Sequence, residues 1–101
     1  HALREACRAR GDIFLTGAIV ATTCEPCPMC AAALHWSRAA TVYQGAAIAD
    51  AATAGFHELH FPAAELLRQG GSPLKIVPDL LRDECRRLFA EWKAGPSGQA
   101  Y

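Results

Sequence analysis

The chain has 101 residues, the size of one ordinary domain and too few for two separate hydrophobic cores. Its 10 Lys and Arg residues balance 10 Asp and Glu residues, and this net charge of +0 argues against a broad surface for nucleic acid or another polyanion. Apolar residues make up 51%, which excludes a disordered chain. We see no apolar run of the roughly 20 residues that cross a bilayer and no signal segment, so we predict a cytoplasmic protein.

Helices and strands are predicted to alternate along the chain. In chain order the pattern predicts a helix over 1–10, a strand over 18–22, a helix over 29–38, a strand over 41–46, a long connection over 47–61, a short helix over 62–69, a strand over 74–77 and a helix over 79–93. Gly11 is the expected stop of the first helix, and Asp79 is the expected cap of the last. This alternation favours an α/β layered domain.

The two ends of the chain carry expectations of their own. The first helix has no capping residue before it, so we expect the natural protein to continue upstream, with strands and a helix that this chain lacks. We treat 1–101 as a single domain that is truncated at its N-terminus. Residues 94–101, rich in glycine, are expected to form a flexible tail that ends in Tyr101.

Three of the five cysteines lie within seven residues, at Cys24, Cys27 and Cys30. Clustered cysteines in a cytosolic chain bind metal or do chemistry more often than they form disulfides. Pro28 suits the first turn of a helix, and Cys27 and Cys30, three residues apart, then share one face of that turn. The positive end of a helix favours thiolates, and two thiolates on one face suit Zn²⁺.

The segment Thr23–Cys30 ends in Pro-Cys-x-x-Cys, the second half of the zinc-deaminase signature. Together with 36–38, 50–56, the aromatic helix ending at Trp92 and the terminal Tyr101, it makes the chain resemble the cytidine and deoxycytidylate deaminase superfamily, and within it the bacterial guanine deaminases and nucleoside deaminases. The resemblance implies a three-layer α/β/α sandwich. It also implies one Zn²⁺ per subunit, with Cys27 and Cys30 as metal ligands.

The resemblance implies a hydrolytic deaminase that converts an amino-purine, above all guanine to xanthine, with release of ammonia. In the family a His-x-Glu pair supplies the third ligand and the catalytic base. Here His1-Ala2-Leu3 has leucine where glutamate belongs. Either His1 binds the metal, or the ligand histidine lies four residues before His1 and the glutamate two before it. In the second case the chain as given lacks its base and should be inactive.

The resemblance also assigns residues around the substrate. Glu58 corresponds to a second acidic residue that relays protons to the purine, and we predict it to be catalytic. Trp36, Phe56 and Tyr101 are predicted to bind the base. The partners expected are a small nucleobase and a second subunit, because the family's C-terminal segment crosses to the partner in a homodimer. Neither nucleic acid nor a membrane is expected to bind.

Several alternatives stay open from the sequence. The substrate could be adenosine in transfer RNA, cytidine, cytosine or a pterin-like ring. Cys24, Cys27 and Cys30 could begin an iron–sulfur run, although Leu34 stands where its fourth cysteine belongs. The cysteines could also hold a structural zinc in a non-catalytic dimerisation module. A glutamate upstream of His1 would separate the enzyme from the module.

Overall fold

The computed structural model describes residues 1–96 and 98–101 of the chain, so Ser97, part of the predicted tail, lies outside the described residues. The elements are α1 (Ala2–Arg10), β1 (Ile19–Cys24), α2 (Pro28–Trp36), β2 (Thr41–Ala46), α3 (Ile48–Thr53), α4 (Ala63–Gln69), β3 (Lys75–Val77) and α5 (Arg82–Ala94). No helix in this described part is long and apolar enough to cross a lipid bilayer.

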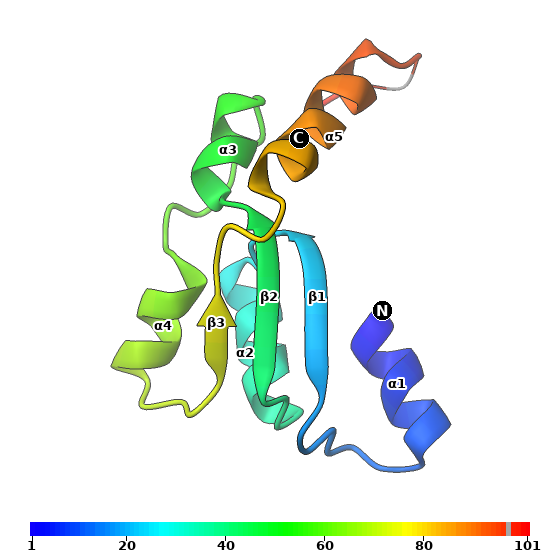
Figure 1. The fold of residues 1–101 in the computed structure, drawn as a ribbon, viewed down its shortest axis with the longest axis vertical. Helices are drawn as coiled ribbons and strands as arrows, with labels where there is room; N and C mark the ends of the chain where they lie inside the picture. The colour runs from blue at the N-terminus through cyan, green and yellow to red at the C-terminus, as the bar shows by residue number, and fades with distance from the viewer. Residues whose placement is uncertain (97) are drawn as a thin grey trace.

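The three strands form one parallel sheet in the order β1-β2-β3 (Figure 1). Ile19 of β1 pairs with Thr41 of β2, which in turn pairs with Lys75 of β3. Parallel strands need crossover connections, and α2 and α4 supply them. All three strands therefore end at the same edge of the sheet, where an α/β protein usually carries its site.

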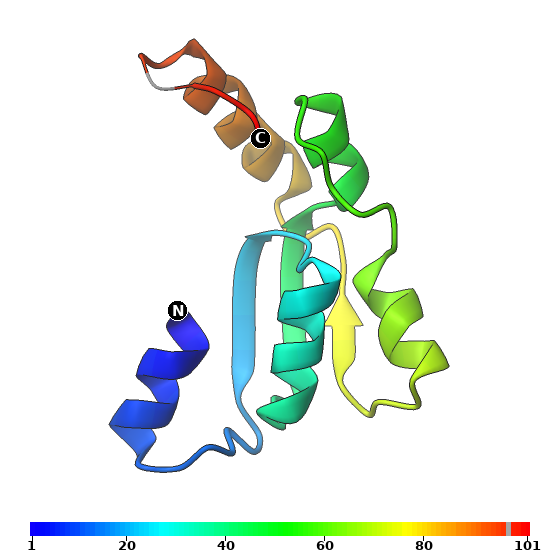
Figure 2. The same cartoon turned by 180° about the vertical axis from the view of Figure 1, so that it is seen from behind.

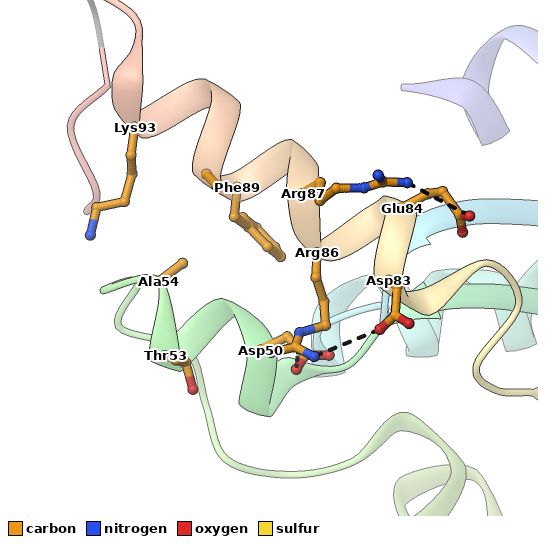
Figure 3. Close-up of a pocket in the computed structure, with 10 residues that line it drawn as sticks. Asp50, Thr53, Ala54, Asp83, Glu84, Arg86, Arg87, Phe89 and Lys93 are labelled. Atoms are coloured by element: carbon orange, nitrogen blue, oxygen red, sulfur yellow. Dashed lines mark ion pairs between the residues drawn. The ribbon is translucent and has the colours of Figure 1, made fainter.

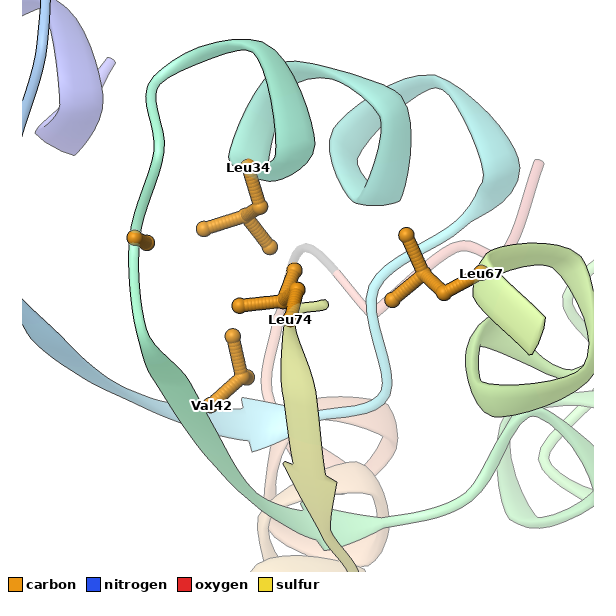
Figure 4. Packing of buried hydrophobic residues seen from close by; sticks show 5 residues of the cluster. Leu34, Val42, Leu67 and Leu74 are labelled. Atoms are coloured by element: carbon orange, nitrogen blue, oxygen red, sulfur yellow. The ribbon is translucent and has the colours of Figure 1, made fainter. Parts of the chain in front are cut away.

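Helices α2 and α4 lie together on one face of the sheet (Figure 2). The core between these helices and the sheet is built from Leu34, Val42, Leu67 and Leu74, with Ala39 beside them (Figure 4). Val42, the second residue of β2, is fully buried.

Helix α5 packs against β2 from the other face. Side chains alternate along a strand, so Gly45 faces opposite to Val42. A Cβ atom at position 45 would overlap Cys85 Sγ and would lie 3.0 Å from the carbonyl oxygen of Thr23. Gly45 therefore lets α5 approach the sheet, which has helices on both faces as the predicted three-layer α/β/α sandwich requires.

Two expectations about local structure are corrected. The connection 47–61 contains α3, which is held by the Asp50 side chain accepting a hydrogen bond from the backbone N–H of Ala47 at 2.8 Å. Asp79 does not cap the last helix, because α5 begins at Arg82. Asp79 and Leu81 both adopt positive φ, at 65° and 51°, and the chain turns there before the helix starts.

The strongest local signals hold. Gly11 ends α1 in the left-handed conformation, with φ of 70°, as the sequence predicts. Cys7 on α1 and Cys85 on α5 are both half-buried free thiols.

Candidate metal and substrate site

The cysteine loop lies at the edge where the strands end. β1 ends at Cys24, and α2 begins at Pro28 with Cys27 as its N-cap residue. Cys27 keeps extended backbone angles, φ of −66° and ψ of 167°, and Pro28 occupies the first helical turn, where a missing N–H costs nothing. The loop is therefore short, and the first turn of α2 carries both Cys27 and Cys30.

The side chains of Cys27 and Cys30 are close enough to interact. Burial raises the pKa of the Cys30 thiol, and a hydrogen bond with the Cys27 side chain raises this pKa further. Two adjacent thiols are half of a tetrahedral zinc donor set. Within residues 1–96 and 98–101, no three His, Cys, Asp or Glu side chains are grouped so that they could hold a metal ion. The described residues thus fit the thiolate half of a zinc site.

A cavity of about 750 Å³ opens beside these cysteines. Its lining includes Cys24, Cys27 and Cys30, and also Phe56, Glu58 and Tyr101, together with His1 and the first residues of α1. The structure therefore brings the two predicted thiolate ligands together with three of the four residues predicted to contact or process a base.

Tyr101 contacts the segment that carries Glu58 within the same chain. The Tyr101 hydroxyl donates a hydrogen bond to Glu58 Oε1, and the Tyr101 carbonyl oxygen accepts one from the backbone N–H of His57 at 3.1 Å. The Tyr101 ring lies edge-on to Phe56, with 4.9 Å between the ring centroids. The bond to Glu58, followed by burial, raises the pKa of Tyr101 to about 12.

Cys24 is the third thiol of this cavity. Burial, followed by the negative charge of Glu58, raises the pKa of Cys24 to about 11. The Cys24 thiol therefore holds its proton more tightly than an ordinary thiol does.

Trp36 lies away from the cavity. It stands at the last turn of α2 and is 67% exposed. Its ring packs edge-on to His35 at 5.1 Å, and the Arg38 guanidinium lies 5.9 Å from its centroid. Within the chain, Trp36 does not line the cavity with the cysteines, and its role in binding a base stays a prediction.

A second cavity, of about 770 Å³, lies between α3 and α5 (Figure 3). Its main charged contact is Asp50, whose side chain is 9% exposed and pairs with Arg82 at 2.9 Å and Arg86 at 3.3 Å. The hydrogen bond from Arg82 lowers the pKa of Asp50, against the smaller opposing effect of burial. The cations nearest Asp50, Arg82 and Arg86, are already paired with carboxylates. We therefore interpret this cavity as the packing junction between α3 and α5.

Sequence reasoning missed Glu25, the residue between Cys24 and Pro26. Its side chain bonds to the backbone at the starts of α3 and α4. The signal available in the sequence was an acidic residue in the short loop, directly before Pro-Cys.

Comparisons with known proteins agree with this geometry. Residues 1–46 match the family model of the cytidine and deoxycytidylate deaminase zinc-binding region. The guanine deaminase of Bacillus subtilis (strain 168) is 46% identical over 57 residues, which are 56% of this chain and 36% of that protein. The tRNA-specific adenosine deaminase of Agrobacterium fabrum is 48% identical over 44 residues, 44% of this chain and 29% of that protein.

Solved structures share the fold over almost the whole chain. A guanine deaminase from Nitrosomonas europaea superposes with a TM-score of 0.81 at 27% identity, covering 93% of this chain and 54% of the other. The protein NE0047, solved in complex with 2,6-diaminopurine, gives a TM-score of 0.82 at 26% identity and covers 99% of this chain and 56% of its own. The chain thus spans about half the length of these structures.

The matched zinc-binding region over residues 1–46, the fold and the cysteine loop all make the chain similar to the cytidine and deoxycytidylate deaminase superfamily. Within that superfamily the chain is similar to bacterial guanine deaminases, as the resemblance in its motifs predicted.

Proposed function

We propose that this chain is the zinc-binding part of a hydrolytic deaminase that acts on an amino-purine base, above all on guanine, to give xanthine and ammonia. The observation that carries the proposal is a single cavity that both Cys27 and Cys30 line together with Phe56 and Glu58. Relatives that are guanine deaminases, and a structural neighbour that holds 2,6-diaminopurine, support a purine as the substrate class.

Each residue has a role that its chemistry allows. Cys27 and Cys30 would hold one Zn²⁺ per chain, and further ligands besides these two cysteines would complete its coordination. When bound, zinc in such a site supplies a Lewis acid that activates water near neutral pH. Phe56 offers a flat apolar surface for a purine ring, and Glu58 can accept or donate a proton at the cavity wall. The Tyr101 hydroxyl orients Glu58 through its hydrogen bond.

The enzymatic test is ammonia release. The full-length, zinc-loaded protein is incubated with guanine, adenosine, cytidine and cytosine, and with transfer RNA that contains the adenosine substrate. We expect release from guanine and little from the others. Release from transfer RNA alone would favour the function of the Agrobacterium fabrum relative. No release from any substrate would favour a non-catalytic zinc module and would contradict the proposal.

The metal test uses matched cysteine variants. Cys27→Ser and Cys30→Ser should each lower bound zinc from one ion per chain toward zero, measured by elemental analysis after gel filtration. Cys7→Ser, a half-buried thiol on α1, is the control and should retain the metal. Zinc retention in both site variants would remove the thiolate pair from the proposed site. Light scattering of the same samples tests whether the protein is the proposed homodimer.

A further inference from the structure

Glu25 connects the cysteine loop to three other places in the chain. Its carboxylate oxygens accept hydrogen bonds from two backbone N–H groups, Oε1 from Ile48 at 3.0 Å and Oε2 from Ala63 at 2.7 Å. Its own backbone N–H donates to the carbonyl oxygen of Ala46 at 2.8 Å. One residue therefore bonds to the end of β2 and to the first residues of α3 and α4.

The two amides that Glu25 accepts from need an acceptor outside their helices. Ile48 and Ala63 are the first residues of α3 and α4, and the first N–H groups of a helix have no partner within it. Both residues are buried, Ile48 with 5% and Ala63 with 0% of its surface exposed, so water is a poor substitute. Hydrogen bonds to a carboxylate are also roughly twice as strong as those between neutral groups.

The segment between these two amides carries two more residues of the candidate site. Phe56 and Glu58 lie between Ile48 and Ala63 in sequence, so one carboxylate holds both ends of the stretch that presents them. Cys27 is only two residues beyond Glu25. Both carboxylate oxygens of Glu25 are engaged by the backbone, so this residue is poorly placed to exchange protons with a substrate and well placed to fix distances.

We propose that Glu25 is a positioning residue that locks the Cys27–Cys30 turn against the 48–63 segment, so that the sulfurs and the Glu58 carboxylate keep one separation. The inference deepens the proposed function and rests on it for the roles of the sulfurs and of Glu58. The link itself consists of the three hydrogen bonds and does not depend on the identity of the substrate.

The test is Glu25→Gln in the full-length protein. Glutamine keeps the size of the side chain but replaces one acceptor oxygen by an NH₂ donor, so it can accept from only one of the two amides. We expect hydrogen exchange at Ile48 or Ala63 to become at least about ten-fold faster. We also expect a zinc Kd about ten-fold higher, as for other residues that orient a metal ligand from behind, and a lower kcat.

Glu65→Gln is the matched control. Glu65 lies on α4 and pairs with Arg68 within the same helix, away from the cysteine loop. It should leave zinc affinity, kcat and the exchange of the Ile48 and Ala63 amides unchanged. If Glu25→Gln exchanges faster at these amides but keeps the wild-type zinc Kd and kcat, Glu25 only completes two helix starts and the proposal is overturned.

Glu25→Asp covers the case in which the glutamine variant does not fold. Aspartate keeps both acceptor oxygens on a shorter side chain, so we expect a folded protein with a zinc Kd between those of wild type and a site-disrupted variant. Wild-type zinc affinity combined with faster exchange at both amides would again overturn the proposal. Failure of the proposed function has a different signature: wild type would release no ammonia, while zinc Kd and exchange rates would still decide the role of Glu25.

Discussion

The two faces of the sheet are held by different forces. On one face, α2 and α4 enclose a close-packed apolar cluster around the fully buried Val42. On the other, α5 has no fully buried residue; it meets the sheet at the Gly45–Cys85 contact, and ion pairs from Arg82 and Arg86 join it to Asp50 of α3. Apolar burial should therefore set the stability of the domain. The position of α5 should instead depend on the absence of a side chain at Gly45 and on the charge of Asp50.

The largest effect is expected on the apolar face. Leu34 is 5% exposed and packs in the core cluster, so Leu34→Ala removes buried methyl groups and leaves a cavity. We expect the free energy of unfolding to fall by about 3 kcal/mol, measured by urea denaturation. Leu88→Ala on α5 is the control, because Leu88 is 47% exposed and should cost less than half as much. Equal losses would contradict the distinction between the faces.

The second largest effect is expected at Gly45, where α5 comes close to the sheet. In Gly45→Ala the new methyl group would overlap Cys85 Sγ and would lie 2.8 Å from Cys85 Cβ. Relieving the overlap must shift α5, and we expect a loss of about 1–3 kcal/mol in urea denaturation. The double variant Gly45→Ala/Cys85→Ala should recover part of that loss, since the sulfur is gone. If the losses of the two single variants simply add in the double variant, the strain does not come from the contact with Cys85.

The sequence predicted the elements whose signals are local. The helices α2 and α4, the strand β2 and the left-handed Gly11 depend on a few neighbouring residues, and the structure confirms them. The six-residue α3 escaped, because it depends on the Asp50 side chain and on Glu25, which is 23 residues away from Ile48. The Asp50 bond is local, but the long-range bond from Glu25 leaves no pattern in a window of sequence.

The candidate site divides in the same way. The spacing of Cys27 and Cys30 is readable because a helical turn brings residues three apart onto one face. Phe56, Glu58 and Tyr101 could be nominated only through resemblance, since their meeting depends on how the long connection folds back. The structure places these three beside the cysteines, and their catalytic and binding roles stay predictions.

A smaller effect is expected from the charge that joins α3 to α5. Asp50→Asn removes the carboxylate that pairs with Arg82 at 2.9 Å, and we expect a loss of about 1–2 kcal/mol at pH 7 in urea denaturation. Asp83→Asn is the control, because its side chain is 91% exposed and its contact with Arg86 is 3.8 Å, and it should change stability by less than about 0.5 kcal/mol.

The pH dependence of the Asp50 contribution has a definite sign. The folded protein holds the pKa of Asp50 below its ordinary value of about 4, chiefly through Arg82. The stabilisation is therefore fully present above that ordinary pKa and is lost as the pH falls through the lower, folded pKa. The difference in unfolding free energy between wild type and Asp50→Asn should shrink on acidification below about pH 4. A difference that grows on acidification would contradict the ion pair.

The smallest effect tests the contact of Tyr101 with Glu58. Tyr101→Phe keeps the ring against Phe56 and removes the hydroxyl that donates to Glu58, so we expect a loss below about 1 kcal/mol for this exposed pair. Because the folded pKa of Tyr101 is raised to about 12, this contribution is present below the ordinary pKa of about 10 and disappears as the pH rises through 12. The ultraviolet titration of wild type minus that of Tyr101→Phe isolates this one phenol. A midpoint near pH 10 would mean that the Tyr101 hydroxyl does not bond to Glu58. The polar contact between the end of the chain and the segment after α3 would then be absent.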